Sequence, residues 1–218
     1  MMADLHVHTT WSKDGRSKPQ EVIDVCIERG IGIVAISDHN EIGAYDEVKD
    51  NGKVIVIPAE EVSSKEGHII GLGIDRKIAR GMSIQETIDA IHEAGGFAVA
   101  VHPYRWWSGL GEKNTLKYDF DCIEALNARS VRGANRRSLK LSERIGKPVT
   151  AGSDAHSPGR VGWGYVDLPD DITDWQGAVK AIMEGKAVPH SVSRRPTETL
   201  RYGFKSIGQW MFRGFRKM

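Results

Sequence analysis

Apolar and polar residues follow two different periods along the chain, and the two periods alternate. Nearly continuous runs of β-branched residues, such as residues 31–37 and 53–59, are typical of strands buried on both faces of a parallel sheet. Residues 3–8 alternate between polar and apolar positions, which also favours a strand. These patterns predict strands over residues 3–8, 31–37, 53–59, 68–74, 97–102, 120–128, 148–152 and 165–168.

Helical spacing of apolar residues separates most of these predicted strands. Pro19 marks the beginning of one helix and Gly30 its end, and Ser83 with Glu86 forms a capping box that begins another. Residues 104–119 fit neither period, so we expect an irregular functional loop there. The predicted helices are residues 17–30, 41–48, 83–93, 133–145 and 173–183.

The alternation of strands and helices predicts an α/β fold with a mostly parallel sheet of about seven βα units. A closed barrel and a doubly wound open sheet both satisfy this pattern. The length of 218 residues fits one compact domain. We expect that domain to occupy residues 1–190.

Charge is distributed unevenly, although the formal net charge of the chain is only +1. Residues 186–218 contain eight basic residues and one acidic residue, so this segment carries +7 and the remainder −6. Apolar residues within 200–215 have helical spacing. We expect residues 191–218 to form a basic helical extension packed on or next to the domain. Contact of its basic face with RNA or an anionic surface is the alternative.

The two cysteines, Cys26 and Cys122, lie in apolar runs and are expected to be reduced thiols in the core. The N-terminus has no signal-like stretch, and no apolar run approaches the ~18 residues that a transmembrane helix needs. The expectation is a cytoplasmic protein without a transmembrane segment.

Histidines and carboxylates gather at the ends of the predicted strands. His6 and His8 are two residues apart on a strand, so both imidazoles point to one face and can reach the same ion. His92 and His190 lie elsewhere and are expected to be ordinary surface residues. The other strand-end candidates are Asp14, Asp38, His39, Asn40, Glu60, Glu61, His68, His102, Asp154 and His156.

This combination of side chains predicts a metal site. Imidazole and carboxylate ligands without thiolate suit Mn²⁺, Zn²⁺ or Fe²⁺. The ligands are too many for one ion, and two or three ions within about 4 Å are the usual device for hydrolysing phosphate esters. The chain has no G-x-S-x-G motif and no P-loop, so a metal-activated water is expected to attack phosphorus.

The motifs DLHVHTT…DG, SDHN, PAEEVSS, GHIIGL, VHP and TAGSDAH occur in this order over residues 3–165. Together they resemble the PHP (polymerase and histidinol phosphatase) family. The resemblance implies a distorted seven-stranded, TIM-like (βα)7 barrel with a trinuclear metal centre at the C-terminal ends of its strands. It also implies a metal-dependent phosphoesterase.

The resemblance further implies a set of ligands for each metal ion. One ion would bind His6, His8, Glu61 and Asp154; a second would share Glu61 and add His68 and His102; a third would bind Asp14, His39 and His156. The family motif aligns with Glu61 and makes Glu60 its neighbour. Catalytic roles fall to Glu61, Asp154 and His156.

Asp14 occupies a position that is often histidine in histidinol-phosphatase-like members. An aspartate there resembles the branch that acts on nucleotide 3′,5′-bisphosphates and short oligonucleotides. That branch usually carries a small extra domain between the positions of His68 and His102, where this chain has only 33 residues. The substrate therefore stays open among a small phosphomonoester, a nucleotide such as a 3′,5′-bisphosphate, and an oligonucleotide end.

A phosphate substrate needs cations besides the metals, and a guanidinium matches phosphate geometry. The candidates are Arg105, Arg129 and Arg160, with surface arginines as the competing interpretation; Asn135 is a weaker candidate. Trp106 and Trp107 either stack on a base or sugar or cover the mouth of the barrel.

Two other functions compete with the hydrolysis of phosphate esters. The first is a non-catalytic regulatory or nucleic-acid-binding module that keeps the barrel and its metals. The presence of competent residues at all nine ligand positions argues against it. The second is a metal-dependent amide hydrolase, which often needs a bridging lysine that no strand-end motif supplies.

Overall fold

The computed structural model describes residues 1–191 of the chain. Within that range there are nine strands, β1 (Met2–Val7), β2 (Ile31–Ile36), β3 (Ile55–Ser63), β4 (His68–Leu72), β5 (Phe97–Ala100), β6 (Cys122–Asn127), β7 (Val149–Gly152), β8 (Gly164–Asp167) and β9 (Val188–Ser191). The helices there are α1 (Pro19–Arg29), α2 (Ala44–Val48), α3 (Ile84–Glu93), α4 (Gly111–Lys117), α5 (Arg132–Ile145) and α6 (Trp175–Met183), with a 3₁₀ turn η1 (Pro158–Arg160). Residues 192–218 of the expected basic extension lie outside the described residues.

All eight predicted strands and all five predicted helices are confirmed, with ends that shift by a few residues. The local signals act as expected. Pro19 is the first residue of α1, Gly30 ends it with φ 69°, and Ser83 accepts a hydrogen bond from Glu86 N at the start of α3. The prediction of an irregular loop over 104–119 is wrong in part, because α4 lies inside it.

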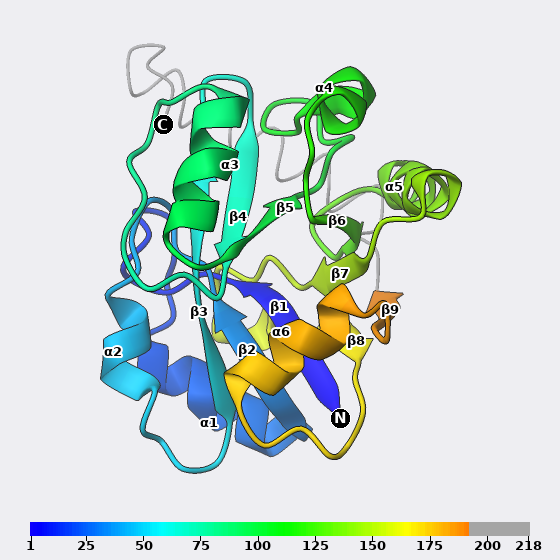
Figure 1. Ribbon diagram of the computed structural model, residues 1–218. Helices are drawn as coiled ribbons and strands as arrows, with labels where there is room; N and C mark the ends of the chain where they lie inside the picture. Colours follow the sequence, from blue (N-terminus) through cyan, green and yellow to red (C-terminus); the bar gives the residue numbers. More distant parts are fainter. Residues whose placement is uncertain (192–218) are drawn as a thin grey trace.

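The strands form one sheet in the order β7-β6-β5-β4-β3-β2-β1-β8-β9 (Figure 1). The expected count of seven strands is therefore wrong for the described residues, since β8 and β9 extend the sheet. The expectation of a mostly parallel sheet is confirmed only in part: β4 is antiparallel to β3 and β5, and β8 to β1 and β9, so four of the eight strand pairings are parallel. Only residues 64–67 connect β3 to β4, and a parallel crossover needs about a dozen residues or more.

The sheet curls into a nearly closed barrel, because the chain beyond β7 reaches β1. Asp154 N donates to His6 O at 2.7 Å, and His8 N donates to Ala155 O at 2.9 Å. Gly152 permits this approach, since a Cβ atom there would lie 2.2 Å from His6 Cβ. A side chain at this position would push β7 away from β1.

Apolar side chains fill the barrel and the spaces beneath its helices. The interior cluster includes Leu5, Ile33 and Ile57 from the strands, with Ala178 and Ile182 from α6. Separate clusters lie under α1 and α2 and under α3, the helices on the outer side of the strands (Figure 1). Burial of each such isoleucine contributes about 1.5–3 kcal/mol. Among the described residues, no helix is long and apolar enough to span a membrane.

Candidate metal centre

The nine predicted ligand side chains come together at one edge of the barrel. His6 and His8 stand at the end of β1, His39 follows β2, and Glu61 lies in β3. The antiparallel direction of β4 is important here, because it brings His68, the first residue of that strand, to the edge where the parallel strands end. The remaining predicted ligands, Asp14, His102, Asp154 and His156, follow β1, β5 and β7.

Glu61 lies at the centre of the cluster and is only 1% exposed. Its Oε1 atom is 2.8 Å from His68 Nδ1 and 2.9 Å from His102 Nε2. Its Oε2 atom is 3.1 Å from His39 Nδ1, 3.2 Å from His8 Nε2 and 3.4 Å from His6 Nε2. Burial by itself raises the pKa of this carboxyl, but the surrounding imidazoles, led by His68, hold it well below its usual range. Glu61 is therefore an ionised carboxylate among five imidazoles.

Glu60 has a different position from its neighbour, because consecutive strand residues face opposite sides of the sheet. Its Oε2 atom accepts a hydrogen bond from Ile78 N at 2.8 Å, outside the cluster. Of the two adjacent glutamates, Glu61 is the one that lies among the histidines, in agreement with the motif alignment.

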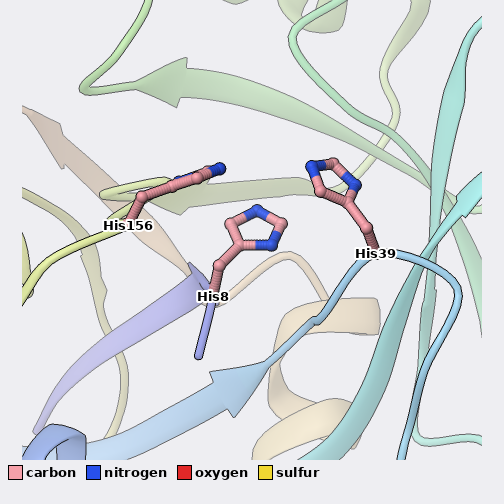
Figure 2. Close-up of side chains that lie close together, drawn as sticks. All are labelled: His8, His39 and His156. Atoms are coloured by element: carbon pink, nitrogen blue, oxygen red, sulfur yellow. The ribbon is translucent and has the colours of Figure 1, made fainter. Parts of the chain in front are cut away.

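His8, His39 and His156 form the more open side of the cluster, and Figure 2 shows their three rings pointing toward one another. The ring centroid of His8 lies 4.5 Å from that of His39 and 4.2 Å from that of His156. Asp14 completes this side, with Oδ2 3.0 Å from His156 Nε2 and Oδ1 3.9 Å from His39 Nε2. These side chains come from three separate segments, so barrel closure brings them together.

The donor set fits divalent metal ions. Four groups of three ligands, namely His8/His39/His156, His6/His102/Asp154, His6/His8/Glu61 and His39/Glu61/His68, have donor atoms within 4.8 Å of one another. Burial lowers the pKa of His39 to about 4 and that of His102 to about 3, so both imidazoles are neutral, as metal ligands must be. Asp14 Oδ1 is buried without a hydrogen-bond partner.

The electrostatics of His6 and the strained backbone around the cluster also support a metal site. Burial opposes protonation of His6, yet the carboxylates around it, led by Asp154, raise its pKa well above the usual value. The cluster therefore attracts positive charge. Among the described residues, the non-glycine residues with positive φ are Asn40 (56°), His102 (31°) and Asp154 (50°), all next to or within the cluster. Such strained conformations persist where the surrounding structure fixes a functional group.

Glu124 is a functional residue that the sequence analysis missed. It is 2% exposed; Oε1 accepts from His6 Nδ1 at 2.9 Å and Oε2 accepts from His102 N at 2.8 Å. Asn127 Nδ2 donates to both oxygens. A proton held on Nδ1 leaves Nε2 of His6 free to face the cluster. The available signal was a single acidic residue inside a mostly apolar, buried strand.

Asp38 has a supporting position and is not a ligand in this arrangement. Its carboxylate accepts from the backbone N–H and hydroxyl groups of Thr9 and Ser12, at 2.6–3.1 Å. Ser12 Oγ also lies 3.2 Å from His8 Nδ1 and accepts from His39 N at 2.8 Å. Asp38 therefore holds the loop after β1, which supports two of the ligands.

Two of the three candidate arginines reach the cluster. Arg105 Nη2 donates to Asp154 Oδ2 at 2.6 Å, and Arg129 Nη1 donates to Asp154 Oδ1 at 2.8 Å. Together they hold the pKa of the buried Asp154 well below its usual range, although burial raises it. Arg160 instead stacks on the ring of Trp163 at 4.1 Å. Asn135 binds the backbone of Asn127 through both ends of its amide.

The two remaining histidines and the two cysteines lie apart from the cluster. His92 is exposed and pairs with Asp121, as expected, and His190 stacks on Tyr165. Cys26 and Cys122 are buried free thiols, which confirms the prediction. Trp106 and Trp107, in the loop after His102, are 95% and 65% exposed.

Family models and several known proteins match this chain. Residues 4–111 match the family model described as PHP domain, and residues 132–187 match the model described as PHP-associated. The uncharacterized protein MJ1587 of Methanocaldococcus jannaschii is 38% identical over 142 residues, which is 59% of this chain and 82% of that protein. The 3′,5′-nucleoside bisphosphate phosphatase of Chromobacterium violaceum is 26% identical over 226 residues, which is 87% of this chain and 78% of that protein.

A solved structure shares the fold. It is a two-domain protein from Bacteroides vulgatus containing a predicted PHP-like metal-dependent phosphoesterase. Its TM-score to this chain is 0.72 at 15% identity, covering 94% of this chain and 69% of that one. At this identity the likeness supports the barrel and nothing about the substrate.

Proposed function

The chain belongs to the PHP family of metal-dependent phosphoesterases, and from this premise we propose that it hydrolyses phosphate esters of nucleotides or oligonucleotide ends at a trinuclear metal centre. The observation that carries the proposal is the convergence of nine histidine and carboxylate side chains, Glu61 and Asp154 among them, at one edge of the barrel. An apolar barrel has no structural need for such a cluster, because five imidazoles around one carboxylate contribute little to folding without an ion between them.

We assign the ligands as follows. His6, His8, Glu61 and Asp154 would hold the first ion, and Glu61, His68 and His102 the second. Asp14, His39 and His156 would hold the third. Glu61 contacts imidazoles of both sets, with Oε1 2.8 Å from His68 Nδ1 and Oε2 3.2 Å from His8 Nε2, which fits its place in the first and the second set. The ligand types suit Mn²⁺, Zn²⁺ or Fe²⁺.

Bound divalent ions would lower the pKa of a water molecule and neutralise the charge that develops on phosphoryl oxygens. Side chains of the protein would bind and orient the phosphate. Arg105 and Arg129 would hold the other phosphate oxygens, because both guanidinium groups are fixed at the cluster by Asp154. Asp154 thereby aligns the phosphate-binding groups with the ligands. His156 is 14% exposed and would stand with Asp14 on the side where substrate enters.

A nucleotide substrate is proposed on two grounds. Asp14 is the ligand type of the branch that acts on nucleotides, and the bisphosphate phosphatase of C. violaceum is a relative over most of both chains. Residues 192–218 carry seven basic residues and one acidic residue, and we propose that they contact the phosphates of an oligonucleotide. Binding of RNA should then weaken steeply between 50 and about 200 mM salt. A salt dependence unchanged by removal of residues 192–218 would contradict that role.

The test combines metal content with phosphate release. Elemental analysis should find two or three divalent ions per chain, and removal of the ions with EDTA should abolish release of phosphate until Mn²⁺ is restored. The substrates would be adenosine 3′,5′-bisphosphate, a short 5′-phosphorylated RNA, histidinol phosphate and glycerol phosphate.

The variants Asp154→Asn and His8→Ala should lose turnover, whereas His92→Ala, a histidine outside the cluster, should keep it. Full activity in Asp154→Asn would overturn the proposed mechanism. Bound metals with no release from any substrate would favour the non-catalytic module.

A further inference from the structure

Two adjacent tryptophans project into solvent from the connection between β5 and α4. Trp106 is 95% exposed and Trp107 is 65% exposed. Tyr104, two residues earlier, is placed differently: Arg137 lies 3.9 Å from its ring, and its hydroxyl donates to Glu112 at 2.7 Å. The loop therefore packs one half-buried aromatic residue against Arg137 and Glu112 and leaves the two tryptophans exposed. Exposed apolar side chains that adjoin one another are typical of binding sites.

The turn that carries Trp106 and Trp107 is held firmly on both sides. Arg105 N donates to His102 O at 2.8 Å, and Gly109 N donates to Arg105 O at 2.9 Å. On the other side, His68 N donates to Ser108 O at 3.0 Å. A Cβ atom at Gly109 would lie 2.5 Å from Arg105 O, so the turn can close this tightly only with glycine. Both anchors, His102 and His68, are proposed metal ligands, which couples the tryptophans to the centre.

The same turn also reaches the phosphate-binding groups. The side chain of Arg105 is 9% exposed and contacts Asp154, while the next two residues face solvent. Three consecutive residues of this turn therefore supply one candidate phosphate-binding group and two exposed indole rings. The part of a nucleotide that extends from its phosphate is a sugar and a flat base. Stacking of a base on an aromatic ring tolerates any sequence, because every base has a π-face.

We infer that Trp106 and Trp107 form a stacking subsite for an unpaired nucleobase of the substrate. This inference rests on the proposed hydrolysis of phosphate esters and names the substrate class. The subsite makes the enzyme select esters that carry a base over phosphomonoesters of similar charge that lack one.

The kinetic test compares two substrates, adenosine 3′,5′-bisphosphate and glycerol phosphate, in Trp106→Ala and Trp107→Ala. Loss of base stacking should lower kcat/KM for the nucleotide by about 5- to 150-fold, mostly through KM. The value for glycerol phosphate should change less than twofold. Trp106→Phe should restore most of the nucleotide activity, because phenylalanine keeps a flat ring. Leu116→Ala, at an exposed apolar residue of α4, is the matched control and should behave as the unchanged protein does. Equal loss with both substrates, or no loss with the nucleotide, would overturn the inference.

A binding measurement separates this inference from the proposed function. A hexameric phosphorothioate oligodeoxyadenylate, which resists hydrolysis, should quench the tryptophan fluorescence of the metal-loaded protein, and the double variant Trp106→Phe/Trp107→Phe should reduce that change. Quenching without any hydrolysis of the substrate panel would leave the subsite standing and remove the proposed function. Hydrolysis of the nucleotide with no quenching and no effect of the tryptophan variants would leave the proposed function standing and remove the subsite.

Discussion

The substitution Glu124→Gln tests how the first metal ligand is oriented. In the protein, Glu124 accepts hydrogen bonds from His6 Nδ1, His102 N and the Asn127 side chain, and it is 2% exposed. Glutamine has the same shape but replaces one acceptor oxygen with an NH₂ donor. Whichever way the amide turns, that donor faces either the backbone N–H of His102 or Nδ1 of His6. In the second orientation His6 can adapt only by moving its proton to Nε2, the atom that faces the cluster.

The expected loss of Mn²⁺ affinity follows from the two orientations of the glutamine amide. A buried donor left facing another donor costs about 1–3 kcal/mol, and substitution of a group that orients a metal ligand costs about 10- to 100-fold in affinity or activity. Because each tenfold change corresponds to about 1.36 kcal/mol, the two figures agree. We therefore expect Glu124→Gln to weaken Mn²⁺ binding by about 10- to 100-fold.

Calorimetric titration of the metal-stripped protein with Mn²⁺ measures this change, and phosphate release at saturating Mn²⁺ should recover in part. Glu143→Gln, an exposed glutamate on α5, is the matched control and should bind Mn²⁺ normally. Wild-type affinity and activity in Glu124→Gln would refute the reasoning, because the proton on His6 would then not depend on Glu124.

Two further predictions concern closure of the barrel and its thiols. Gly152→Ala places a methyl group 2.2 Å from His6 Cβ and should cost about 1–3 kcal/mol of stability, which lowers Tm by several degrees. Gly159→Ala is the control and should leave Tm nearly unchanged, because a Cβ there meets nothing within 4 Å. Equal Tm values for the two variants in thermal denaturation would contradict the close approach of β7 to β1. Burial raises the pKa of Cys26 and of Cys122 to about 12, so only about one thiol in 10⁴ is ionised at pH 8. A disulfide reagent should therefore modify neither cysteine in the native protein and both after denaturation. Rapid labelling of the native protein would show that the two cysteines do not lie in the core.

Local patterns were sufficient to predict most of the elements and most of the side chains that are proposed as ligands. Runs of β-branched residues identified the strands, and the two-residue spacing of His6 and His8 placed both imidazoles on one face before any partner was known. The positions of the ligands at strand ends also predicted a common edge, because the carboxyl ends of parallel strands meet there. These inferences need only the geometry of single elements and the direction of neighbouring strands.

The tertiary structure decided the relations between distant segments. Glu124 and His6 are 118 residues apart, and only the curvature of the sheet and the close approach of β7 to β1 at Gly152 bring their side chains within hydrogen-bond distance. Similarly, Arg105 and Arg160 are equivalent as sequence, yet one reaches Asp154 and the other stacks on Trp163. A pattern along the chain fixes which way a side chain points from its own element. What it meets there depends on how the barrel closes.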